Sequence, residues 1–298
     1  MNILAEVAEI RGRSAEAEKL LSNALEILLE EEDGERAASL LNNLGNSALG
    51  KGDLVEAERN FNRALEILTR DGVDKGSFKV RLGLATIRIA ESKLGEAVEI
   101  LVGILNQENE FDNNAGFNPR FKAGALSNLG LCYLRLGDLF NLKVMSGEIP
   151  GERSVERDIL SDLAPKDRVG KIVSAFQRIT HSLPESEKPK DEDADSQLSH
   201  YYTKAERCIK DSIAIYRGLP DPHKLFKVQE LLAMFLLKVG PTRWAESELL
   251  LRDVVRLSNE HGFPLTKLPN DTCWFELLGY TDPNAQWDYP PRPKYWRL

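Results

Sequence analysis

Residues able to do covalent or metal chemistry are few in this chain and lie far apart. Its 298 residues include four histidines and three cysteines, namely His181, His200, His223, His261, Cys132, Cys208 and Cys273. None of them forms an HExxH or CxxC spacing, and no glycine-rich phosphate loop accompanies them. A catalytic site needs such groups gathered in one cleft. We therefore predict that the protein is not an enzyme and that it has no metal site and no cofactor.

The polar residues that can act together are asparagines. Asn42, Asn43 and Asn46 share the stretch LLNNLGN, and Asn128 stands in the similar stretch LSNLG. An asparagine side chain offers both a donor and an acceptor. It can therefore hydrogen-bond the backbone of an extended peptide without requiring a particular side chain from it. The chemistry that the sequence favours is recognition of another protein.

Charge and hydropathy narrow the class of partner. The net charge is −8, and acidic residues concentrate in residues 1–35 and 182–196. This balance disfavours binding to a phosphate backbone. The longest apolar run, Leu231–Leu237, is much too short to span a membrane. We expect protein partners, no nucleic acid and no transmembrane segment.

The elements that must position the asparagines are helices. Between Leu41 and Leu68, apolar and small residues follow two helical periods that meet at the break GKGD. Small residues at Gly45, Ala48 and Ala57 stand where two antiparallel helices would cross. We expect Asp53 to cap the second helix, with Glu56 completing a capping box.

The same hairpin recurs at a fixed step of the sequence. The matching positions are Leu4, Leu44 and Leu84, then Ala17, Ala57 and Ala97, then Leu21, Phe61 and Leu101. This pattern, L-G-x-x-A/Y followed by A-x-x-x-F-x-x-A, resembles the tetratricopeptide repeat, and its longer step is similar to the repeats of kinesin light chains. The resemblance covers residues 1–108 and returns at 122–137. It implies an all-α solenoid of stacked hairpins that forms a right-handed superhelix, with the first helices lining a concave groove.

We divide the chain into four parts. Residues 1–146 hold four repeats, the fourth with a second helix, LFNLKVM, that is cut short by Gly147. Residues 147–217 form an irregular helical hairpin in which 166–181 pairs with 198–217, and 182–197 is an acidic disordered insertion. Residues 218–262 form a final hairpin, with Leu232, Ala233, Leu236, Gly240, Ala245 and Leu249 on the repeat pattern. Residues 263–298 form a capping helix and an aromatic, proline-rich tail.

Two surfaces are candidates for binding. The first is the groove, and its predicted contact residues are Asn42, Asn43, Asn46, Lys79, Thr86, Ser127 and Asn128. The alternative for these side chains is that they bond one another between repeats. The second surface is the tail, where the content of tryptophan, tyrosine and arginine is typical of an interface anchor. Its candidates are Trp287, Tyr289, Arg292, Tyr295 and Trp296, which form a latch, a cap or a docking segment.

These surfaces support two functions. The first is a non-catalytic scaffold or adaptor that binds an extended segment of a partner protein in the groove. The alternative is a structural subunit or assembly factor of a multiprotein complex, anchored through the tail. The odd, separated cysteines favour a reducing intracellular compartment. Met1 falls inside the first repeat, so either the chain extends upstream, which we favour, or the first helix is short and frayed. The cytoplasm is then the expected location, or an organelle matrix or stroma if a targeting segment is missing.

Overall fold

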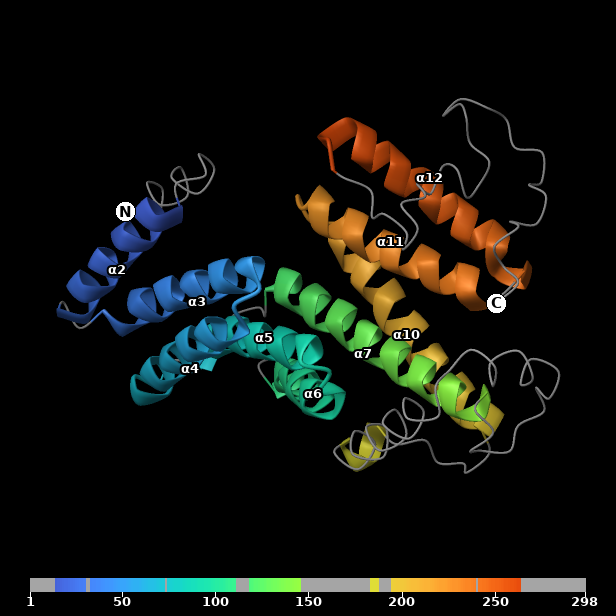
Figure 1. The fold of residues 1–298 in the computed structure, drawn as a ribbon, viewed down its shortest axis with the longest axis horizontal. Coiled ribbons are helices and arrows are strands. Elements are labelled where there is room, and N and C mark those ends of the chain that lie inside the picture. The colour runs from blue at the N-terminus through green and yellow to red at the C-terminus, as the bar shows by residue number, and fades with distance from the viewer. Residues whose placement is uncertain are drawn as a thin grey trace.

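The chain forms a succession of α-helices, most of which pack against the next helix along the sequence (Figure 1). The computed structural model describes residues 14–30, 33–72, 74–110, 118–145, 183–187, 194–239 and 241–263. Its helices are α2 (Ser14–Glu30), α3 (Gly34–Lys51), α4 (Leu54–Arg70), α5 (Asp74–Ala90), α6 (Leu94–Glu110), α7 (Pro119–Met145), α10 (Ala194–Arg217), α11 (Pro222–Val239) and α12 (Trp244–His261). Short 3-10 helices are η1 (Glu185–Glu187) and η2 (Pro241–Arg243). The described residues contain no β-strand, and the protein is an all-α solenoid of helical hairpins.

Helices α3 and α4 form the hairpin that the sequence predicts most clearly. Gly52 adopts a left-handed conformation (φ 79°) that ends α3. The N–H of Asp53 then bonds to the carbonyl of Ala48 at 2.9 Å, which closes the turn. The Asp53 side chain accepts from the N–H of Glu56 at 3.0 Å, so the predicted cap is present. Glu56 does not return the bond, because Asp53 already donates to Ala48, and Glu56 accepts from Asn60 instead.

Glycine at the helix crossing explains how closely these helices approach. A Cβ atom added at Gly45 would lie 2.7 Å from the ring of Phe61. A Cβ atom added at Gly83, on the next first helix, would lie 2.4 Å from the same ring. Phe61 is fully buried. One phenylalanine of α4 therefore packs on the bare backbones of α3 and α5, which joins two consecutive repeats.

Helix α7 pairs with α10, although residues 146–193 separate them in sequence. The two helices pack extensively and antiparallel, side by side in Figure 1. A Cβ atom added at Gly130 would lie 2.5 Å from Ile209, and one at Gly137 would lie 2.4 Å from Tyr202. Ala205, Ile209 and Ser212 of α10 are fully buried, in the same spacing as Ala57, Phe61 and Ala64 of α4. Helix α10 thus takes the place of the second helix of the fourth repeat.

Two details of this region differ from the expected organisation, and a third expectation stays a prediction. Residues of the segment LFNLKVM continue α7 to Met145 and do not begin a second helix. The segment 166–181, which we expected to pair with 198–217, lies outside the described residues. The stretch 182–197, expected to be disordered, includes the buried Leu183 and the first residues of α10. The remaining domain boundaries stay predictions.

The final hairpin is formed by α11 and α12, with its second helix shifted by two residues from the expected register. Ala245 and Leu249 are exposed, whereas Ser247, Leu251 and Val254 are buried. These three repeat the spacing of Ala57, Phe61 and Ala64. The 3-10 turn Pro241–Arg243 lengthens the connection and causes the shift, because α12 begins only after it. The hydroxyl of Ser247 donates to the carbonyl of Ala233 at 2.9 Å across the crossing.

Candidate functional site

The predicted groove residues lie on the first helices α3, α5 and α7, which pack in sequence beside one another. Asn43 and Asn46 are exposed on α3. Four further residues are half-buried, namely Lys79, Thr86, Ser127 and Asn128. The structure therefore gives an exposed amide pair on one helix and a set of partly accessible polar groups on the two helices that follow it.

Two of these side chains are bonded to each other between repeats. The Asn128 amide donates to the Thr86 hydroxyl at 3.2 Å, and this hydroxyl donates to the carbonyl of Leu82 at 2.9 Å. Ser127 donates to the carbonyl of Gly124 at 3.0 Å. For these groove residues, the alternative to ligand binding was that they bond one another between repeats. The contact of Asn128 with Thr86 is such a bond. It fixes both side chains while leaving them partly exposed.

Asn42 differs from the other candidates because it is buried. Its side chain is 1% exposed, and neither its amide nitrogen nor its amide oxygen has a hydrogen-bond partner. The cause is its register, since Asn42 follows the buried Ala38 by four residues and precedes the buried Gly45 by three. Asn42 thus belongs to the packed stripe of α3. A buried amide without partners is unfavourable, and in this conformation it is closed to a ligand.

Ion pairs that the sequence analysis missed connect separate helices. Arg88 of α5 pairs with Glu58 of α4, with Glu91, and with Glu96 of α6 at 2.9 Å. Hydrogen bonding to Glu58 raises the pKa of Arg88 above its ordinary value. Arg243 similarly joins Glu206 of α10 to Glu246 of α12. The pairs of Arg88 with Glu58 and Glu96, and that of Arg243 with Glu206, depend on the packing of separate helices, so the sequence gives no indication of them. The pairs with Glu91 and Glu246 are local, each three residues from its arginine.

A further cluster gathers around Glu187, which follows the buried Leu183. Its carboxylate accepts from the Tyr133 hydroxyl of α7 and from the Lys204 ammonium of α10, the latter at 2.7 Å. Burial raises the pKa of Glu187, but the hydrogen bonds from Lys204 and Tyr133 outweigh it and hold this pKa below its ordinary value. Burial and the bond to Glu187 raise the pKa of Tyr133. No sequence motif predicted this cluster, because Glu187 lies in a charged stretch with few apolar residues.

The comparison with known families concerns the N-terminal repeats. Residues 1–70 match the family model described as tetratricopeptide repeat, and this range includes the α3–α4 hairpin with its glycine crossing. This part of the chain thus consists of tetratricopeptide repeats. A search of curated proteins finds no match to it. The similarity to kinesin light chain repeats is not confirmed by the family match and stays a prediction.

Tetratricopeptide repeats are in general protein-interaction modules and are typically not catalytic. Two of the three cysteines lie in the described part of the chain. Burial raises the pKa of Cys132 to about 12 and that of Cys208 to about 11, so both thiols stay protonated and unreactive near neutral pH. Among the described residues, no three His, Cys, Asp or Glu side chains are placed to hold a metal ion.

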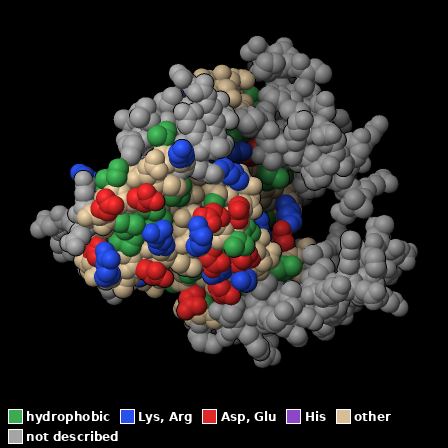
Figure 2. All heavy atoms as spheres, turned by 60° about the vertical axis from the view of Figure 1, so that its left-hand side comes forward, with side chains coloured by type: hydrophobic (Ala, Val, Ile, Leu, Met, Phe, Trp, Pro, Cys, Tyr) green, Lys and Arg blue, Asp and Glu red, His purple; other side chains and the backbone are tan. Residues whose placement is uncertain are grey.

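The surface charges of the N-terminal repeats alternate in sign. Figure 2 shows Lys and Arg side chains interspersed with Asp and Glu side chains on the side of the molecule that carries α2 to α4. This face has no single-sign field to attract a nucleic acid backbone. In the described part of the chain, no helix combines the length and the hydropathy that a membrane crossing requires.

The second predicted surface, the aromatic tail from Trp287 to Trp296, lies outside the described residues. Its role as a latch, a cap or a docking segment stays a prediction, as does the anchoring of a multiprotein complex through it. The compartment in which the protein works also stays a prediction.

Proposed function

We propose that the protein is a non-catalytic scaffold or adaptor that binds an extended segment of a partner protein across α3, α5 and α7. The observation that carries this proposal is the exposure of Asn43 and Asn46, which lie about one turn apart on α3. Each amide can donate to and accept from the backbone of an extended peptide. The family match supports the proposal, since tetratricopeptide repeats generally bind proteins.

The neighbouring helices provide partly ordered contacts for the same peptide. The bond between Asn128 and Thr86 holds two polar side chains in fixed positions before a ligand arrives. Less side-chain entropy is then lost on binding. Lys79, half-buried near the start of α5, offers a positive charge to a carboxylate of the partner. We therefore expect recognition through the peptide backbone, with one preference for an acidic group.

A displayed library of short random peptides, selected on the intact chain, tests this proposal. Binders are then titrated against the double variant Asn43→Ala/Asn46→Ala and against Asn62→Ala/Asn106→Ala. The second variant is a matched control, because Asn62 and Asn106 are exposed asparagines on the second helices α4 and α6. We expect Kd to rise about tenfold or more in the first variant alone. Equal Kd values for both variants and the intact chain would contradict the proposal.

A further inference from the structure

The segment Leu183–Glu187 is a short stretch of the region between α7 and α10 that packs on the repeat array. Leu183 is 3% exposed and belongs to the large apolar cluster formed with residues of α6, α7 and α10. Glu185–Glu187 form the 3-10 turn η1, in which the N–H of Glu187 bonds to the carbonyl of Pro184 at 2.8 Å. Figure 1 shows η1 beside the lower end of the array, at α6 and α7. The segment is therefore held at its first residue by the apolar side chain of Leu183 and at its last by the acidic side chain of Glu187.

The acidic end is recognised by three groups from two helices. The carboxylate of Glu187 accepts from the hydroxyl of Tyr133 and from the ammonium of Lys204, while His200 lies 3.4 Å from the main-chain oxygen of Glu187. The Lys204 ammonium also lies 5.4 Å from the centre of the Tyr133 ring. The Glu187 side chain is 13% exposed. We call Tyr133 and Lys204, which both donate to this carboxylate, the carboxylate clamp.

The clamp belongs to the array rather than to the segment that fills it. Tyr133 is 2% exposed and is held in the main apolar cluster, and Lys204 lies on α10 next to the buried Ala205. Both helices are fixed by the glycine crossing at Gly130. A buried phenol and an ammonium that share one carboxylate form charge-assisted hydrogen bonds, which favour an anionic acceptor at this point. The clamp therefore favours a carboxylate, whichever segment supplies it.

The segment reaches the clamp as a tethered ligand. Lys204 lies about 15 Å along α10 from its first residue, Ala194. The peptide units between Glu187 and Ala194 reach at most about 25 Å, so the connection spans this distance with some excess. A short tether of this kind gives an effective concentration in the millimolar range. Weak contacts are sufficient to keep such a segment bound, and an untethered segment with stronger contacts can replace it.

We propose that the carboxylate clamp and the adjoining apolar socket of Leu183 form a second peptide-binding site. Its ligand is an acidic segment of a partner protein that carries a leucine four residues before a glutamate. Leu183–Glu187 occupies this site in the isolated chain. The site is formed by α7 and α10 and does not include Asn43 or Asn46 of α3, so it stands independently of the proposed groove.

A labelled peptide with the sequence of residues 182–190 tests the proposal. It is titrated into the full chain and into the variant Leu183→Ala/Glu187→Ala, whose own segment no longer fills the site. We expect the variant to bind the peptide at least about tenfold more tightly than the intact chain, because the tethered competitor is removed. Adding Lys204→Met should abolish this binding, whereas Arg207→Met, an exposed cation on the same helix, should leave it unchanged.

The chemical class of the ligand is tested with altered peptides. An unrelated acidic peptide that keeps only the leucine and the glutamate at this spacing should bind. The peptide with Glu187→Gln should not. Failure of the original peptide to bind the folded variant would overturn the proposal, and so would binding that is indifferent to Lys204→Met.

Hydrogen exchange on the intact chain gives a second test if the double variant does not fold. Excess free peptide should displace the tethered segment and speed exchange at the N–H of Glu187, which bonds to Pro184 in the structure. Exchange at α3 should not change. Unaltered exchange at Glu187 under saturating peptide would show that the segment is a permanent part of the fold, and the proposal would be wrong.

Discussion

The hairpins α3–α4 and α7–α10 use the same packing with very different connections. In the first, only Gly52 and Asp53 separate the helices. In the second, residues 146–193 stand between them. Yet both pair a glycine of the first helix with a large side chain of the second, Phe61 against Gly45 and Ile209 against Gly130. The comparison indicates that the side chains at the crossing determine which helices pair.

The cost of a long connection is small compared with the packing that it permits. Loop-closure entropy rises only by about 0.6 kcal/mol for each doubling of loop length. Burying one large apolar side chain contributes about 2 kcal/mol. The crossing at Ile209, Ala205 and Ser212 therefore outweighs the long connection to α10. A repeat can accept an insertion between its helices as long as its crossing residues are kept.

The largest effect should come from filling the crossing of the fourth repeat. Gly130→Val would place atoms against Ile209 and against the carbonyl oxygen of Ala205, which lies 3.2 Å from a Cβ at this position. Because backbone cannot move aside cheaply, we expect the free energy of unfolding to fall by about 3 kcal/mol. Urea unfolding followed by circular dichroism measures it.

The control for this change is Gly103→Ala on α6, where an added Cβ meets no atom within 4 Å. Alanine should leave stability equal or raise it by about 0.5 kcal/mol, since alanine favours the helix. A variant Gly130→Val as stable as the original chain would show that α7 and α10 do not pack as described.

A smaller effect is expected when a hydrogen bond between α10 and α7 is removed, one that the α3–α4 hairpin lacks. The buried hydroxyl of Ser212 donates to the carbonyl of Ala123 at 2.8 Å, whereas the matching residue of α4 is Ala64. Ser212→Ala removes the donor and should lower the free energy of unfolding by about 1 kcal/mol. The same urea titration detects it. No change would mean that the hydroxyl adds nothing to the contact of α10 with α7.

The smallest effect should appear in the pH dependence of the α10 contacts. Hydrogen bonding to Arg243 holds the pKa of Glu206 below its ordinary value of 4.5. A lowered pKa stabilises the fold above the ordinary value, and this stabilisation is lost as pH falls through the pKa of the folded state. We expect the original chain to lose more stability between neutral pH and about pH 4 than Glu206→Gln does, by less than about 1 kcal/mol. Thermal melts at both pH values compare them, and equal losses would contradict the assignment.

The sequence predicts the hairpins but not all of their partners. The small residues of the stretch 41–68 and the cap at Asp53 are local features, and both are confirmed. In the sequence, Ala205, Ile209 and Ser212 also have the spacing of a second helix. The packing of this helix on α7 was not predicted, because an amphipathic helix fits any first helix with suitable small residues. The structure packs α10 against α7. The expected pairing of this helix with 166–181 lies outside the described residues and stays a prediction.

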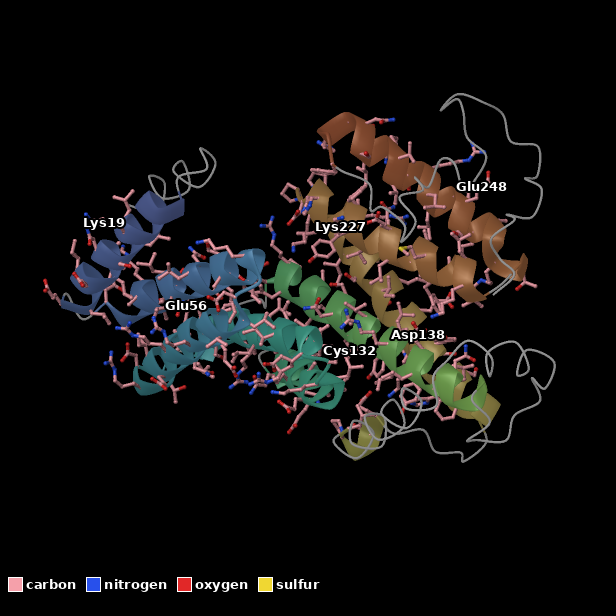
Figure 3. All side chains as sticks on the ribbon, viewed as in Figure 1. Lys19, Glu56, Cys132, Asp138, Lys227 and Glu248 are labelled. Carbon is pink, nitrogen blue, oxygen red and sulfur yellow. The ribbon has the colours of Figure 1, made fainter. Side chains whose placement is uncertain are left out.

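The candidate sites were predicted less completely than the fold. Exposure of Asn43 and Asn46 follows from their register, whereas Asn42 falls in the buried stripe of the same helix. The cluster at Glu187 depends on contacts between segments far apart in sequence. The same holds for the hydrogen bond from the Tyr202 hydroxyl to Asp138, a residue of α7 that is labelled in Figure 3. Such contacts leave no periodic pattern in the sequence, so only the structure reveals them.

A double-mutant cycle between Gly130 and Ile209 tests the pairing of α7 with α10 most directly. Gly130→Ala, Ile209→Ala and the double variant are compared by urea unfolding. In the structure a Cβ at position 130 lies 2.5 Å from a side-chain atom that Ile209→Ala removes. The account predicts that the double variant is more stable than the sum of the single effects allows, by about 1 kcal/mol or more. Additive effects would contradict the contact, and with it the assignment of α10 as the second helix of the fourth repeat.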